Sequence, residues 1–128
     1  MGEEQKIEQP MGNIKISEEV VAIISGIAAS EVSGVAGMSN TFASGIAELL
    51  GKKSLAKGVR VELEETTTSI GISLVVEYGC KIPDVAWEVQ EKVKKAVETM
   101  TGLEVLEVNI FIDGLIMPKE EKPSEPEE

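Results

Sequence analysis

The 128-residue chain is predicted to fold as one α+β domain with two layers, in which helices cover one face of a mainly antiparallel sheet. Segments 59–65 and 69–78 alternate apolar and polar residues, which is typical of half-buried strands. Segments 17–33 and 84–101 space their apolar residues three and four apart, which is typical of helices packed on one side. The length suffices for one hydrophobic core and is too short for two.

The elements are expected in the order β-α-β-β-α-β. A first strand is predicted at residues 12–16, where two isoleucines alternate with polar residues. A helix follows, because Ser17 stands at an N-cap position and acidic residues occupy the first turn. Its buried stripe is predicted to be Val21, Ile24, Ala28 and Val32. Residues 35–43 are expected to be irregular, and residues 43–50 to form a short helix.

The second half of the chain supplies the hairpin, the second helix and a last strand. The short link Thr66–Thr68 between the two alternating segments predicts an antiparallel hairpin. Pro83 and Asp84 open the second main helix, and Gly102 is placed to end it. A strand is expected at 104–113. Both main helices are assigned to one face because the other face of the sheet carries mostly polar side chains.

The charge of the chain argues against two classes of partner. The formal net charge is −11 and the isoelectric point about 4.5. Nucleic acid and anionic lipid both attract positive surfaces, so neither is expected as a partner. No apolar run approaches the roughly 18 residues of a membrane span, and the first ten residues do not resemble a signal peptide. We therefore expect no direct membrane insertion.

The usual catalytic residues are scarce. The chain has no histidine and one cysteine, which removes the commonest general base and the common zinc ligand sets. Cys80 has only Lys81 as an adjacent cation, so a bystander cysteine is the favoured interpretation. Glu62 and Glu64 share the polar face of one strand and are interpreted as solvated. We expect no enzyme activity, no cofactor and no metal.

Two local patterns suggest other ligands. Lys52, Lys53, Lys57 and Arg60 form a basic cluster that would suit a small anionic metabolite or an acyl ligand, although ordinary solvated lysines also explain it. The glycines of the segment Gly34–Gly37 have the G-x-x-G spacing of KH domains, which bind RNA. No cation lies between these glycines, so the end of a helix and a turn explain them better.

Apolar residues outside the predicted core suggest contacts with other proteins. The first helix carries a second apolar row, whose alternative explanation is burial on more than one side. Trp87 lies opposite the core stripe of its helix, although it would also fit flat against the sheet edge or the basic loop. Phe111 falls with Val75 on the polar sheet face by parity, unless a bulge reverses it. The predicted partner-binding residues are Val20, Ile23, Ile27, Trp87 and Phe111.

Several segments together resemble the alkaline shock protein family of Gram-positive bacteria. They are Gly12–Ser17, Gly34–Gly37, Ile46–Gly51, Lys57–Val61, Glu77–Gly79, Ile82–Pro83, Val89–Val93, Thr101–Val105 and Val108–Ile110. The resemblance implies a cytoplasmic, non-enzymatic protein that supports cell-envelope homeostasis under stress. It also implies self-assembly into homo-oligomers and a protein partner embedded in the membrane.

The domain limits are predicted from composition and from the extent of this resemblance. Residues 1–11 are expected to form a flexible arm, and residues 12–117 the folded domain. Residues 118–128 contain mainly Glu, Pro, Lys and Ser, which predicts a disordered acidic tail. The resulting hypothesis is an adaptor or scaffold domain that acts by binding other proteins.

Overall fold

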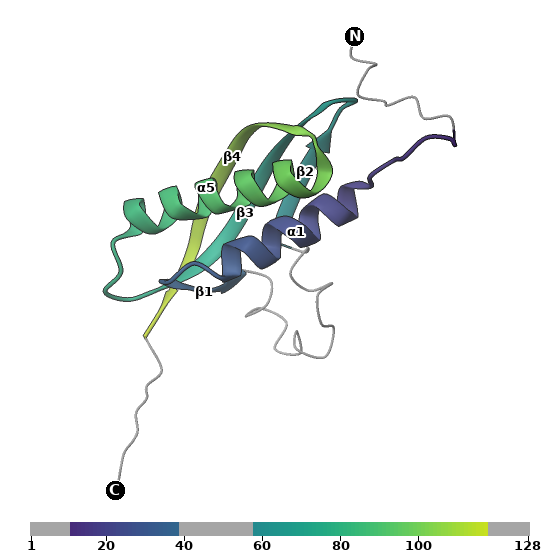
Figure 1. Ribbon diagram of the computed structural model, residues 1–128. Coiled ribbons are helices and arrows are strands. Elements are labelled where there is room, and N and C mark those ends of the chain that lie inside the picture. Colours follow the sequence, from purple (N-terminus) through teal and green to yellow (C-terminus); the bar gives the residue numbers. More distant parts are fainter. Residues whose placement is uncertain (1–10, 39–57, 118–128) are drawn as a thin grey trace, which may run out of the picture.

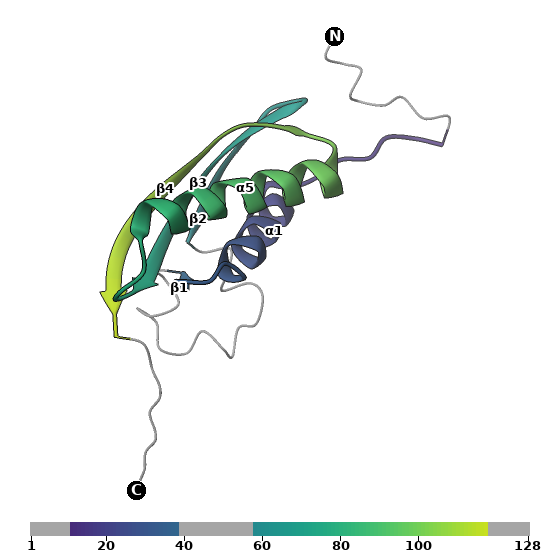
Figure 2. The ribbon, with the colours of Figure 1, turned by 60° about the vertical axis from the view of Figure 1, so that its left-hand side comes forward.

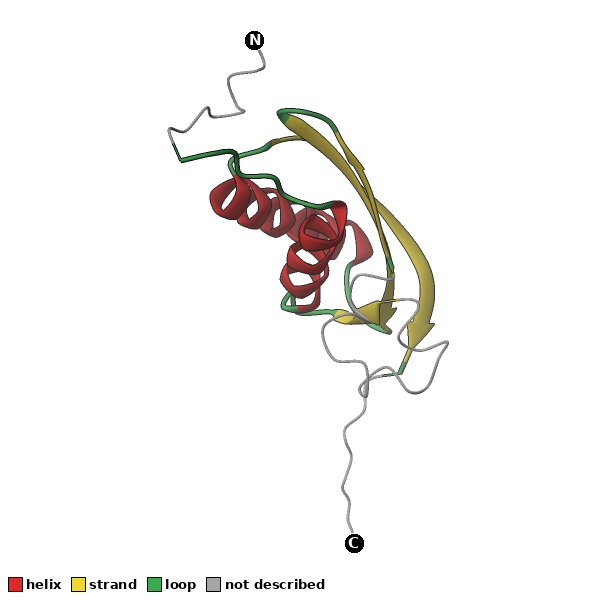
Figure 3. Cartoon of the chain, turned by 90° about the vertical axis from the view of Figure 1, so that its right-hand side faces the viewer, coloured by secondary structure: helices red, strands yellow, loops and turns green. Residues whose placement is uncertain are grey.

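The computed structural model describes residues 11–38 and 58–117, which fold into two layers (Figure 1). The elements are α1 (Glu18–Ser30), β1 (Val35–Met38), β2 (Val59–Leu63), β3 (Thr67–Glu77), α5 (Ile82–Thr101) and β4 (Glu104–Ile116). Figure 3 shows both helices on the inner side of a curved sheet. The predicted α+β class, with helices on one face of the sheet, is therefore confirmed.

The long strand β3 is the centre of the sheet. β2 pairs antiparallel with its first part and β1 antiparallel with its last part, both along one edge. β4 pairs parallel along the other edge over the whole length of β3. The parallel direction follows from α5, which crosses over between β3 and β4. Figure 2 shows β4 running along the border of the sheet.

The first strand lies elsewhere than the sequence suggested. Residues 13–17 form no strand, and β1 occupies residues 35–38, where irregular structure was expected. The order among the described residues is thus α-β-β-β-α-β. Ile14 remains 75% exposed, whereas Met38 is fully buried and pairs with Leu74 of β3. The short helix predicted at 43–50 lies outside the described residues.

Local sequence explains where each helix begins and ends. The Ser17 hydroxyl accepts a hydrogen bond from the Val20 amide at 3.2 Å, as the N-cap prediction requires. α5 has Pro83 in its first turn, and Gly102 follows its last residue with a φ of +80°. Gly34 precedes β1 with a φ of +101°, and Gly37 lies within β1. Gly34 therefore belongs to a turn and Gly37 to a strand, so the G-x-x-G segment is not a loop between two helices.

The hydrophobic core lies between the helices and the inner sheet face. The predicted stripe of α1 is buried, as are the apolar residues Val85, Val89, Val93 and Val97 of α5. β3 contributes Ile70, Ile72, Leu74 and Val76, each at most 1% exposed. Alternate residues of β3 thus face the helices, as the period of two predicted.

Candidate interaction surface

The five predicted partner-binding residues lie on three elements. Val20 is 45% exposed on α1, while Ile23 and Ile27 are half-buried. α1 packs against α5, β2 and β1, and its small residues Ala22, Ser25, Gly26 and Ala29 are buried as well. Packing on several sides therefore accounts for much of the apolar character of α1. In the second apolar row of α1, formed by Val20, Ile23 and Ile27, mainly Val20 remains accessible to solvent.

Trp87 projects from α5 and is 60% exposed. Helical spacing places it on the same side of α5 as Gln90, Lys94 and Glu98. Lys92 lies on another side of the helix, where its ammonium is 3.9 Å from the Glu31 carboxylate at the end of α1. Trp87 is thus directed toward β4, and the apolar row of α1 is not part of the same surface.

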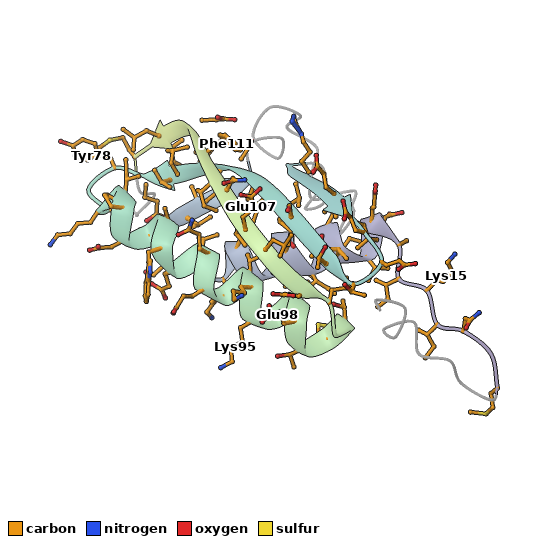
Figure 4. The ribbon with its side chains drawn as sticks, turned by 90° about the horizontal axis from the view of Figure 1, so that it is seen from above. Lys15, Tyr78, Lys95, Glu98, Glu107 and Phe111 are labelled. Atoms are coloured by element: carbon orange, nitrogen blue, oxygen red, sulfur yellow. The ribbon has the colours of Figure 1, made fainter. Side chains whose placement is uncertain are left out.

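Three side chains of α5 bind the backbone of β4. The Gln90 amide donates to the Val108 carbonyl at 2.9 Å. The Lys94 ammonium donates to the Val105 carbonyl at 3.3 Å, and the Val105 amide donates to the Glu98 carboxylate at 3.0 Å. These contacts hold the helix along the beginning of β4, where Glu98 is visible in Figure 4.

The surroundings of the Glu98 carboxylate favour its charged form. The hydrogen bond from the Val105 amide lowers the pKa of Glu98 below its ordinary value, and a hydrogen bond from Lys94 at 3.1 Å adds to that effect. Glu98 therefore carries its charge throughout the neutral range. Its arrangement is that of a structural tether between helix and strand.

Phe111 is 54% exposed on the sheet face opposite the helices (Figure 4). Its neighbour in β3 is Ser73, which alternates with the buried residues Ile72 and Leu74. A Cβ atom added to Gly71 would lie 3.5 Å from the Phe111 ring, which is ordinary van der Waals contact, so the ring lies over Gly71 of β3. Val75, grouped with Phe111 by parity, is instead buried, at a point where both neighbouring strands shift register.

The remaining predicted ligand residues form no complete site among the described residues. Arg60 is exposed on β2, whereas Lys52, Lys53 and Lys57 lie outside the described residues. Cys80 is a free thiol, half-buried against the core. Within residues 11–38 and 58–117, no three His, Cys, Asp or Glu side chains gather as a metal site would require.

Sequence reasoning missed the contacts between α5 and β4. The spacing of Gln90, Lys94 and Glu98 was visible, but nothing local indicates that a strand edge lies beside them. Leu106 and Leu115, 60% and 55% exposed on β4, were also not predicted as surface residues. In the described part of the chain, neither helix is long and apolar enough to cross a membrane.

Comparison with known proteins gives one family match. The model of the alkaline shock protein 23 family, described as having a cell envelope-related function, matches residues 6–117. The uncharacterized protein YqhY of Bacillus subtilis is 44% identical over 105 residues, which are 82% of this chain and 78% of that protein. YloU of the same organism is 41% identical over 106 residues, covering 81% of this chain and 88% of that protein.

More distant relatives and solved structures are also similar. A stress response regulator gls24 homolog of Streptococcus pyogenes is 28% identical over 102 residues, which are 79% of this chain and 57% of that protein. Among solved structures, the copper form of the MamM CTD D249H variant has a TM-score of 0.47 and 16% identity, covering 77% of this chain and 98% of that one. At that score the structural likeness adds nothing to the fold described above.

Proposed function

This chain belongs to the alkaline shock protein 23 family, which has a cell envelope-related function, and on that basis we propose that it is a non-enzymatic scaffold domain. It supports cell-envelope homeostasis by binding a protein partner and by self-association. The domain acts from the cytoplasm and reaches the inner face of the membrane through a membrane-embedded partner. The naming of relatives as stress response regulators supports a role under stress.

The observation that carries this proposal is the exposed indole of Trp87. Trp87 is 60% accessible to solvent, on a helix whose valines Val85, Val89, Val93 and Val97 are packed into the core. Tryptophan is also enriched among the residues that dominate binding energy at protein interfaces.

Substitution of Trp87 tests the proposal directly. The tagged full chain and its Trp87→Ala variant are used to capture proteins from detergent-solubilised cells. We expect the variant to fold normally and to recover at least about tenfold less of a specific envelope partner, as loss of a hot-spot residue predicts. Met100→Ala is the matched control, because Met100 is 68% exposed on the same helix. Equal recovery by the wild type and the Trp87 variant would contradict the assignment.

The alternative of a small anionic ligand has no support among the described residues. Its candidate cluster is represented there only by Arg60. Thermal melting of the full chain with a set of anionic metabolites would reveal such a ligand, because binding to the folded state raises the melting temperature.

A further inference from the structure

β4 borders the sheet, and its outer edge is protected over only part of its length. No described strand pairs with that edge. At the beginning of the strand, both backbone groups of Val105 are bonded by α5 side chains, and the Val108 carbonyl is bonded by Gln90. Proteins commonly protect edge strands in such ways, since free backbone groups recruit other strands.

The backbone direction along β4 identifies which groups remain open. Because Val108 bonds to α5 and successive residues alternate in direction, the N–H and C=O groups of Ile110 and Ile112 also point away from β3. Asp113 is an extra residue at a register shift, since Ile112 pairs with Leu74 and Gly114 with Val75. Beyond Asp113 the even-numbered residues of β4 direct their backbone groups toward β3 and no longer away from it. The Ile116 carbonyl shows this, because it accepts a hydrogen bond from the Tyr78 amide at 2.7 Å.

The open edge is therefore the segment 109–112. It begins after the Val108 carbonyl bonded by Gln90 and ends before the bulge at Asp113. The segment is apolar apart from Asn109, and it contains none of the Lys or Pro residues that discourage edge pairing. The outward-pointing backbone groups of this segment are therefore available to pair with an added strand.

We propose that this edge of β4 pairs antiparallel with the same edge of a second copy, around a two-fold axis at Phe111. The inference rests on the self-association proposed above and names its surface. In this register Ile110 of each copy exchanges backbone hydrogen bonds with Ile112 of the other, so the open groups satisfy one another. With the two-fold axis at Ile110, the second copy would compete with Gln90 for the Val108 carbonyl. With the axis at Ile112, the paired residues would include the bulge at Asp113.

Side-chain chemistry supports a second copy as the occupant. The register sets Phe111 beside its symmetry mate, and aromatic pairs across strands are favourable. Ile110 lies across from Ile112, and Asn109 from Asp113, so no like charges face each other. Trp87, one turn before Gln90 on the side of α5 that faces β4, flanks the same edge on the inner layer. Pairing would thus cover Phe111 and Trp87, two of the three exposed aromatic residues in the described part of the chain.

A charge at the axis tests the register. Sedimentation velocity of the full chain over a concentration series is expected to show a reversible dimer that strengthens with salt, because two copies of charge −11 repel each other. Phe111→Glu should weaken dimerisation at least about tenfold, since it places like charges together. Leu106→Glu is the matched control, with the same charge change at a position 60% exposed on the same strand. A mixture of Phe111→Glu and Phe111→Lys should restore a mixed dimer.

Cross-linking gives an independent measurement if the charged variant folds poorly. In a Cys80→Ser background, Phe111→Cys should oxidise to a covalent dimer, because Cα atoms of such a pair lie about 4.5 Å apart, within disulfide range. Leu106→Cys should not. A wild-type dimer unaffected by Phe111→Glu, with no cross-link at residue 111, would overturn the β4 surface but leave self-association standing. A wild-type chain that stays monomeric would overturn the inference, and the Trp87 capture experiment would then decide the scaffold role separately.

Discussion

Gly34 illustrates how a single residue holds this fold together. Its φ of +101° is strained for any residue with a side chain. A Cβ atom at this position would lie 2.8 Å from Cγ2 of Val85 and 3.4 Å from Cβ of Cys80. Its carbonyl accepts from the Glu77 amide at 3.0 Å. The turn before β1, the end of β3 and the start of α5 therefore meet at a place where only glycine fits.

Replacing Gly34 with alanine should lower the free energy of unfolding by roughly 2–4 kcal/mol. About 1–2 kcal/mol comes from the positive φ and the rest from overpacking against Val85. Gly79→Ala is the matched control, because its φ is +98° and an added Cβ atom there would have nothing within 4 Å. Urea denaturation of both variants measures the two costs. Equal costs would mean that Val85 moves aside without penalty.

At the scale of elements, the contacts of α5 with β4 explain why the last strand lies where it does. A parallel strand after a crossover helix has a free outer edge, and α5 satisfies its first part through Gln90, Lys94 and Glu98. The same side chains orient the helix, and helical spacing places Trp87, one turn before Gln90, on the side of α5 that carries them. The contacts with α5 and the proposed interface thus occupy successive parts of the outer edge of β4.

Glu98 should give this tether a defined pH dependence. Its pKa is lowered in the folded state, so the carboxylate stabilises the fold above its unfolded-state pKa and loses that contribution as the pH falls through the folded-state value. Glu98→Gln should therefore be less stable than the wild type near neutral pH, and the difference should disappear in acid. Chemical denaturation at both pH values measures it, with Glu91→Gln on the same helix as control. A difference that persisted in acid would show that charge is not the cause.

The whole molecule carries a large negative charge that its described ion pairs do little to offset. The chain has 23 acidic and 12 basic residues. The described ion pairs Lys92–Glu31 and Lys94–Glu98 are largely exposed, and such pairs contribute little to stability. Repulsion among carboxylates should therefore oppose both the compact state and the association of two copies.

Added salt should raise the melting temperature of the chain. If screening relieves about 1 kcal/mol of repulsion, the rise would be about 4–8 °C for a domain of this size. The double substitution Glu62→Gln and Glu64→Gln removes two exposed carboxylates from one edge of the sheet. It should raise the melting temperature at low salt and reduce the effect of adding salt. Scanning calorimetry at low protein concentration separates this effect from dimerisation, and an unchanged salt response would argue against repulsion.

Those parts of the protein that depend on local periodicity could be predicted from the sequence. The alternation in β2 and β3, the helical stripe of α1, the buried valines of α5, the N-cap at Ser17 and the glycine after α5 follow from backbone geometry and short-range hydrogen bonds. Met100, also expected in the buried stripe of α5, is instead 68% exposed in its last turn. The exposure of Trp87 and Phe111 could also be predicted, because a residue out of phase with a buried stripe points away from the core.

Which segments became neighbours was settled by tertiary packing. Residues 13–16 alternate but form no strand, whereas 35–38 form a strand because the end of β3 offers them a partner. The parallel direction of β4, the burial of Val75 beside two register shifts, and the open edge at Ile110 and Ile112 arise in the same way. Strand pairing joins residues far apart in the chain, and its hydrogen bonds are made by backbone groups common to nearly every residue, so side-chain patterns alone do not specify them.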